Sequence, residues 1–244
     1  MKIKIIKNRS DIGAGTRGSD MGIDAIEIAA INQNNDFFHR HPYVDVKTHN
    51  ESIYHKNTNN FAKRIEHVKE QCQRVADAVK ETIISGDFPI VLSGDHSSAL
   101  GTMSGIKAAN PEKSIGVIWI DAHADLRDAY EGFEQSHASI MFNALKELNN
   151  LEKLTQVGIR DVSEREIELA KNDPRVATFY DWDLKNEQYL GSNWSEQVQQ
   201  IIATLPQKVY VSFDIDGLQP SLCPHTGTPV AGGFELQQIA FLLF

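Results

Sequence analysis

Three apolar segments of the sequence each end in aspartate or histidine side chains. They read PIVLSGDH (89–96), GVIWIDAHAD (116–125) and VYVSFDID (209–216). A short and continuous apolar run is typical of a strand buried in a parallel sheet. In an open α/β sheet, ligands bind beyond the carboxyl ends of the strands. If these three strands are neighbours, we expect the polar side chains at their ends to converge on one pocket.

Helical patterns alternate with strand patterns along the chain, which predicts a three-layer, doubly wound parallel α/β sheet. We expect residues 1–244 to form a single domain, because this length suits one large α/β unit. The polar segment 32–60 is predicted to be irregular, with His39, His41, His49 and His55 as solvated loop side chains. The predicted helices cover residues 19–31, 61–85, 97–109, 137–148, 163–172, 194–205 and 235–244, and the predicted strands cover residues 2–6, 90–92, 116–120, 154–159, 176–180 and 209–213.

Charge and cysteine usage narrow the class of protein. The net charge of −9 argues against a nucleic-acid or anionic-membrane partner. The two cysteines form no CxxC motif, which favours a reducing, cytoplasmic location. Residues 13–18 match GxGxxG, but no acidic residue follows at the end of a second strand, so we interpret this segment as a loop and not as a nucleotide site.

The polar residues at the three strand ends form a set of metal-ligand types. Four carboxylates and two imidazoles suit Mn²⁺ better than Zn²⁺, and they exceed the needs of one ion. Two divalent cations would balance four carboxylates, which would otherwise repel one another in a cleft. Two ions about 3.5–4 Å apart can hold a water and lower its pKa towards about 7. The alternative is that these aspartates only cap turns at strand ends. The set comprises His96, Asp121, His123, Asp125, Asp214 and Asp216.

The segments LSGDHSSALGT, GVIWIDAHADL and SFDIDGLQPSLCPHTGTPVAGG resemble the signature segments of the ureohydrolases, the family of arginases, agmatinases and formimidoylglutamases. The resemblance extends from residue 13 to the last residue. It implies an arginase-type α/β fold, a binuclear manganese site, and hydrolysis of a guanidinium or formimidoyl C–N bond by a metal-bridging hydroxide. A non-catalytic, metal-binding homologue is the alternative from another class.

The resemblance also assigns roles to individual residues. Asp121 and Asp214 would bridge the two manganese ions and so take part in catalysis. His137 matches the family histidine that transfers a proton, and its alternative is an exposed histidine at a helix start. The ligands of one ion would be His96, Asp121, Asp125 and Asp214, and those of the other would be Asp121, His123, Asp214 and Asp216.

Two departures from arginases favour a substrate of the agmatine kind, a guanidino compound without an α-carboxylate. The loop 127–136 lacks the asparagine with which arginases hold the amino acid end of arginine. Ser163 stands where arginases place an aspartate that helps to bind the α-amino group. Arginine and a formimidoyl substrate remain as alternatives.

The C-terminus departs most from the family pattern. The family continues past the helix predicted from residue 235, with a further strand and a glutamate that contacts the guanidinium, whereas this chain ends at Phe244. We therefore expect the C-terminal part of the domain to be missing. We further expect a small guanidino substrate, no membrane or nucleic-acid partner, and assembly into a homo-oligomer.

Overall fold

The computed structural model describes residues 1–14, 17–55, 64–128 and 137–244. The chain forms two compact units. The first comprises residues 1–112 and 128–144, and the second comprises residues 113–127 and 145–244. Within the described ranges, no helix has both the length and the apolar character needed to cross a membrane.

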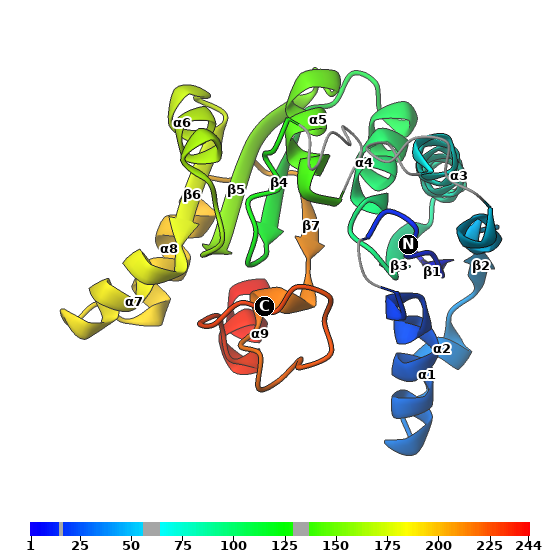
Figure 1. The fold of residues 1–244 in the computed structure, drawn as a ribbon, viewed down its shortest axis with the longest axis horizontal. Coiled ribbons are helices and arrows are strands. Elements are labelled where there is room, and N and C mark those ends of the chain that lie inside the picture. The colour runs from blue at the N-terminus through cyan, green and yellow to red at the C-terminus, as the bar shows by residue number, and fades with distance from the viewer. Residues whose placement is uncertain (15–16, 56–63, 129–136) are drawn as a thin grey trace. The chain divides into compact units, whose positions relative to one another are not determined.

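The first unit contains a three-stranded parallel sheet with the order β2-β1-β3 (Figure 1). Helices α3 and α4 pack side by side, and a side chain at Gly105 would lie 2.5 Å from the carbonyl oxygen of Ala76, so this close approach requires glycine. The elements are β1 (Ile3–Asn8), η1 (Ser19–Met21), α1 (Gly22–Asn32), α2 (Phe37–Arg40), β2 (Tyr43–Asp45), η2 (Asn50–Tyr54), α3 (Ile65–Ile84), β3 (Phe88–Ser93), α4 (Ser98–Ala109) and η3 (His137–Ser139), followed by α5 (Ile140–Glu147), which runs into the second unit.

The apolar face of α3 explains how it packs in this unit. Its valines recur at helical spacing, and Val75 and Val79 are fully buried. They form a cluster with Ile6 of β1 and Val46, which lies just after β2. The long amphipathic helix predicted from the sequence is therefore confirmed from Ile65 onward. Residues 56–63, which include its predicted start, lie outside the described ranges.

The second unit contains a four-stranded parallel sheet with the order β6-β5-β4-β7 (Figure 1). Ile120, at the end of β4, is in register with Val157 of β5 and Phe213 of β7, so the ends of β4 and β7 are level. The elements are β4 (Ile115–Ile120), β5 (Leu151–Ile159), α6 (Glu164–Asn172), β6 (Val176–Tyr180), α7 (Asp181–Tyr189), α8 (Trp194–Ala203), β7 (Val209–Phe213), η4 (Ile215–Gly217) and α9 (Leu236–Leu243).

Helices α7, α8 and α9 share one apolar core with this sheet. Ile120 and Val157 are buried against Ile201 of α8 and Ile239 of α9. Burying an isoleucine or valine side chain contributes about 1.5–3 kcal/mol, so this cluster is a main source of stability for the unit. The core fixes the sheet from which the strand-end residues project.

The parallel α/β fold predicted from the sequence is confirmed. Of the three strands whose ends carry the predicted ligands, β4 and β7 are neighbours, whereas β3 pairs with β1 in the other sheet of the described residues. Segment 32–60 is not irregular throughout, because it contains α2, β2 and η2. Helix α7 was not predicted, because its sequence lacks apolar residues at helical spacing. Leu184 is its one buried apolar side chain. The single domain over residues 1–244 stays a prediction.

Candidate metal centre

Two neighbouring strands of the second unit place acidic side chains at the same level. Asp121 directly follows β4 and Asp214 directly follows β7, and the Asp214 amide donates to the Ile120 carbonyl at 2.9 Å, which continues the strand pairing. Carboxylate oxygens of Asp121 and Asp214 lie within 4.8 Å of each other. The predicted convergence of these two strand ends is therefore present within this unit.

Each strand end then makes a tight turn that returns a second ligand type to the same place. Asp121 Oδ1 accepts from the His123 amide at 2.7 Å, and Asp214 Oδ1 accepts from the Asp216 amide at 3.0 Å. The Ala122 amide donates to Asp216 Oδ1 at 3.1 Å and joins the two turns. The aspartates thus do cap their turns, as the structural alternative proposed. The same turns bring His123 and Asp216 beside Asp121.

The side chains of His123, Asp121 and Asp216 form a compact group. His123 Nδ1 lies 3.3 Å from Asp121 Oδ1 and 3.2 Å from Asp216 Oδ2. The three residues offer ligand atoms within 4.8 Å of one another, and both aspartates are buried. A buried pair of carboxylates facing one imidazole is costly unless a positive charge balances it.

The pKa values of this group are consistent with that requirement. Burial lowers the pKa of His123, but hydrogen bonds to Asp121 and Asp216 and the charges of both outweigh burial and raise this pKa to about 11. Burial, aided by the charges of Asp121 and Asp214, raises the pKa of Asp216 to about 6 despite the opposing effect of His123. The cluster therefore favours a cation at its centre. A divalent ion with oxygen-preferring chemistry fits its donors.

Asp125 lies in the segment after β4, and Glu166 of the same unit holds this segment. Asp125 is buried and has a φ of +52°, a left-handed conformation that aspartate adopts more readily than most residues. Glu166 of α6 is buried, accepts from the Leu126 amide at 3.1 Å and lies 3.5 Å from the Arg127 guanidinium. Glu166 thereby holds Leu126 and Arg127 in place at the end of this segment, a role that the sequence did not indicate.

Arg160 is a second residue of importance that the sequence did not reveal. It follows β5, and its guanidinium donates to the carbonyls of Gly158, Gly217, Leu218 and Val230 at 3.1–3.5 Å, and also to that of Asp216. It therefore ties the turn carrying Asp216 to the loop that precedes α9. Burial lowers the pKa of Arg160.

Gly233 shows how closely that loop approaches. Its φ is +93°, and a side chain there would lie 2.8 Å from the Gly217 carbonyl and 2.9 Å from the Arg160 guanidinium. Glycine is the residue that adopts this conformation without steric cost, so the packing around Arg160 depends on it.

The remaining predicted site residues, His96 and His137, lie in the first unit. His96 follows β3, next to the buried carboxylate of Asp95, whose pKa is raised by burial. Asp95 accepts from the Ser97 amide at 2.8 Å and from the Gly13 amide at 3.1 Å. His137 opens η3, and its Nδ1 lies 2.9 Å from the Gly13 carbonyl oxygen. His137 is therefore anchored and not simply solvated.

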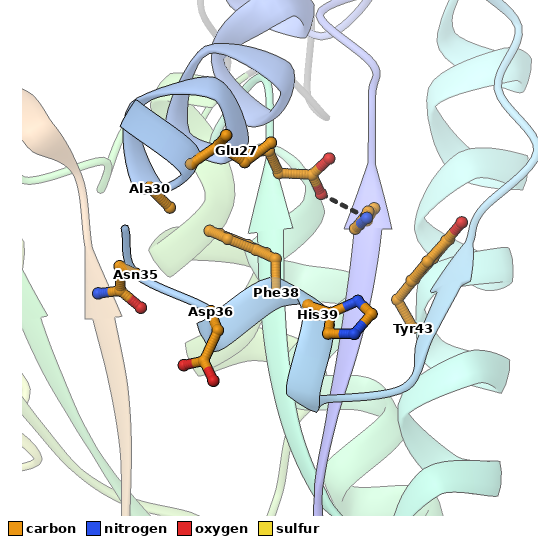
Figure 2. Close-up of a pocket in the computed structure, with 9 residues that line it drawn as sticks. Glu27, Ala30, Asn35, Asp36, Phe38, His39 and Tyr43 are labelled. Atoms are coloured by element: carbon orange, nitrogen blue, oxygen red, sulfur yellow. Dashed lines mark ion pairs between the residues drawn. The ribbon is translucent and has the colours of Figure 1, made fainter. Parts of the chain in front are cut away.

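A pocket of about 290 Å³ in the first unit is unrelated to the predicted site residues (Figure 2). It lies among β1, α1, α2 and β2, and Lys7, Glu27, Phe38 and Tyr43 are among its lining residues. Lys7 forms an ion pair with Glu27 and lies 3.5 Å from the centroid of the Tyr43 ring, so its charge is already satisfied inside the chain.

The sequence of the chain is similar to those of known arginases. It is 30% identical to the arginase of Bacillus caldovelox over 257 residues, covering 97% of this chain and 83% of that protein. It is 31% identical to the arginase of Brevibacillus brevis, with 93% of this chain and 80% of that protein covered.

The fold is similar to those of solved arginase structures. The arginase from Bacillus cereus matches with a TM-score of 0.80 and 26% identity, over 99% of this chain and 84% of that one. The agmatine ureohydrolase of Thermoplasma volcanium, at 24% identity and a TM-score of 0.67 over 99% of this chain and 75% of that one, shares the fold. The family model described as the arginase family matches residues 1–243. The resemblance seen in the three sequence segments is thereby confirmed, and the chain belongs to the arginase family of hydrolases, which act on guanidino C–N bonds.

Proposed function

We propose that this chain hydrolyses a small guanidino compound to urea and an amine with two Mn²⁺ ions. The observation that carries this proposal is the cluster of Asp121, His123, Asp214 and Asp216 at the paired ends of β4 and β7. Water adds to the guanidinium carbon, the C–N bond to the alkyl chain breaks, and the amine leaves with a proton. Family membership supports this reaction over the non-catalytic alternative, in which metal would bind without release of urea.

Five residues of the second unit and His96 are the proposed metal ligands. Asp121 follows β4 and Asp214 follows the paired strand β7, and their carboxylates lie within 4.8 Å of each other. These two residues are therefore proposed as bridging ligands. His123 and Asp216 complete one set of ligands, and His96 and Asp125 are proposed for the other from their motif positions. When bound, the ions would supply Lewis-acid activation of water at neutral pH.

His137 is the proposed proton-transfer residue. The Gly13 carbonyl oxygen can only accept a hydrogen bond, so Nδ1 of His137 carries the proton in the contact between them. This leaves Nε2 as the basic nitrogen of the neutral ring. Nε2 would hold the proton that the departing amine takes, and the buried contacts of Asp95 with Gly13 keep this carbonyl in place.

Replacing His137 with asparagine should lower kcat by about 10²–10⁴-fold, the usual contribution of a positioned acid or base, with a smaller change in KM. Urea release measured with saturating substrate and Mn²⁺ tests this, and added imidazole should restore part of the activity. His55→Ala, an exposed histidine of the first unit, is the matched control. An unchanged kcat in His137→Asn would rule out this role.

Agmatine-like compounds are the substrates that the sequence favours. Ser163 carries no charge, and its hydroxyl is already used to cap α6, 2.7 Å from Glu166 Oε2. It therefore offers little to the α-amino group of an amino acid. The other supporting segment, residues 127–136, lies outside the described ranges from residue 129 onward. Arginine is the second candidate, favoured by the arginases among the relatives.

We expect kcat/KM to be higher for agmatine than for arginine. Side-by-side urea release over a range of both substrates measures this ratio. Ser163→Asp is the informative variant, because aspartate also caps helices and adds the negative charge that an α-amino group would need. It should move the ratio towards arginine. A native preference for arginine would instead establish the arginase reaction.

Location and assembly are extensions of the same proposal. Cys72 and Cys223 are free thiols, which suits the cytoplasmic location expected from the sequence. The homo-oligomer expected from the sequence stays a prediction, which sedimentation of the purified protein would test.

A further inference from the structure

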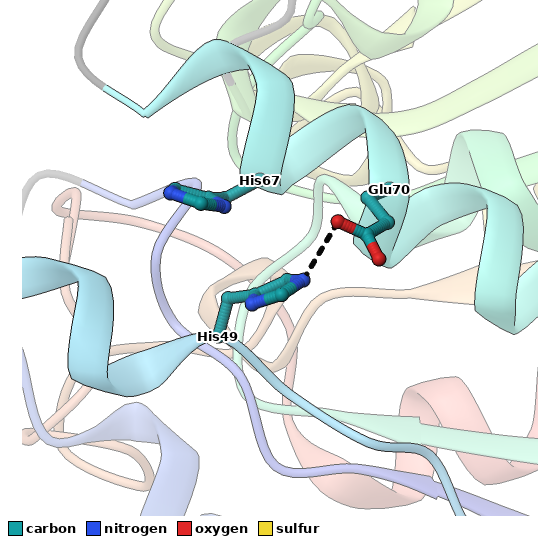
Figure 3. A group of neighbouring side chains, drawn as sticks. All are labelled: His49, His67 and Glu70. Carbon is teal, nitrogen blue, oxygen red and sulfur yellow. Dashed lines mark hydrogen bonds and ion pairs between the residues drawn. The ribbon is translucent and has the colours of Figure 1, made fainter.

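A second group of potential ligands lies in the first unit and contains none of the residues of the proposed reaction. His49 immediately precedes η2, and His67 and Glu70 lie three residues apart on the first turns of α3. Figure 3 shows Glu70 pointing towards His49, with the ring of His67 beside that of His49. The side chain of His49 is 15% exposed, so the sequence-based prediction of a solvated loop histidine is wrong for this residue.

The donor atoms of these three residues are close together. His49 Nε2 lies 2.9 Å from Glu70 Oε2, and the rings of His49 and His67 are 4.8 Å apart between centroids, with 39° between their planes. The three side chains offer ligand atoms that all lie within 4.8 Å of one another. The spacing of His67 and Glu70, i and i+3, places both on one face of α3.

Neighbouring residues orient both His49 and Glu70. The other ring nitrogen of His49, Nδ1, lies 3.5 Å from Glu51 Oε1. The other oxygen of Glu70, Oε1, accepts a hydrogen bond from Arg74 at 2.5 Å, and Arg74 also donates to the Lys47 carbonyl at 2.8 Å. A carboxylate behind a histidine and a hydrogen bond behind a carboxylate are the supports that orient metal ligands in proteins.

Glu70 remains a carboxylate in this arrangement. The Glu70 side chain is 52% exposed, and an exposed glutamate is ionised at neutral pH. An ionised Glu70 can donate electron pairs to a cation, and its Oε2 already faces the other donors.

We propose that His49, His67 and Glu70 bind one divalent transition-metal ion of the Zn²⁺ type. Two imidazoles and one carboxylate are a donor set that Zn²⁺ uses, with water as the fourth ligand. This set contrasts with the carboxylate-rich cluster after β4 and β7, which suits a harder ion. The ion would tie η2 to the start of α3.

The required movement is small. Ligand atoms about 2.0–2.2 Å from a tetrahedral ion lie about 3.4 Å from one another. His49 Nε2 and Glu70 Oε2, now 2.9 Å apart, would separate slightly. The ligand atom of His67 already lies within 4.8 Å of both and would move closer to them. A simple ion pair between His49 and Glu70 accounts for one contact. It leaves unexplained why His67 and Glu51 also face His49.

Zinc binding by the whole chain tests the proposal. Wild type, His67→Ala, Glu70→Gln and His55→Ala are dialysed against the same free Zn²⁺, and bound zinc is measured by elemental analysis. Wild type and the His55→Ala control should bind one more Zn²⁺ per chain than His67→Ala, and Glu70→Gln should bind that ion at least about tenfold more weakly. Zinc at the strand ends contributes equally to all four proteins, and circular dichroism verifies that each is folded.

Glu51→Gln separates a built site from chance proximity. It leaves all three ligands in place and removes the carboxylate behind His49, so zinc affinity should fall by about 10–100-fold. Equal zinc binding by wild type, His67→Ala and Glu70→Gln would overturn the proposal and leave an ion pair only. Neither result depends on urea release, so failure here is distinguishable from failure of the proposed reaction.

Discussion

Asp121→Asn and Asp214→Asn should each lose tight binding of both manganese ions, and urea release should fall at least about 10³-fold. Each residue is proposed to bridge the two ions, so neutralising either one removes a ligand from both. The two carboxylates are within 4.8 Å of each other at the paired ends of β4 and β7, which makes the effect of each substitution similar. Metal ions supply several kcal/mol in such reactions, and about 4 kcal/mol corresponds to 10³ in rate.

Elemental analysis after dialysis against Mn²⁺ measures this directly. We expect two ions per chain in wild type and none held tightly by either variant. Asp183→Asn on α7 is the matched control, because this aspartate is exposed in the same unit. One ion or none in the wild type at saturating Mn²⁺ would disprove the binuclear site. Two ions in either variant would show that the substituted residue does not bridge.

Arg160→Met should destabilise the second unit by about 3–5 kcal/mol. The substitution keeps an unbranched side chain but removes the guanidinium that donates to the carbonyls of residues 158, 216, 217, 218 and 230. The Gly217 carbonyl keeps the Phe234 amide as a donor. Each buried carbonyl left without a donor costs about 1–3 kcal/mol, and partial solvent access reduces the total. For a chain of this length the loss corresponds to a Tm lower by roughly 6–20 °C.

Thermal unfolding followed by circular dichroism checks this value. Arg175→Met is the control, since Arg175 makes a partly exposed ion pair with Asp173 at 2.7 Å that should contribute no more than about 1 kcal/mol. Arg160→Met should also bind Mn²⁺ more weakly, because the Asp216 carbonyl loses its donor. Equal Tm values for the two variants would mean that the hydrogen bonds of Arg160 do not hold these loops together.

The sequence alone determined the parallel α/β fold and placed Asp121, His123, Asp214 and Asp216 at the ends of two strands, whereas the roles of His96 and Asp125 as ligands stay predictions. A short apolar run such as residues 117–120 is typical of a strand buried in a sheet that is covered on both faces. Side chains of a strand alternate with a period of two, so Asp121 and His123 leave the same strand end together. Both signals are local, since they depend on residues within a few positions of one another. The pairing of β4 with β7 confirmed what they predict for Asp214 and Asp216.

Only the tertiary structure decided the interactions that join distant segments. Arg160 reaches the carbonyl of Val230, 70 positions away, and Glu166 caps α6 while holding Leu126, 40 positions away. His49, which precedes η2, lies beside His67 and Glu70 of α3, 18 and 21 positions further along the chain. An arginine after a strand, a glutamate in a first helical turn and a loop histidine have no periodic signature. Their partners are backbone groups or side chains brought near by packing, and a one-dimensional pattern carries no information about such contacts.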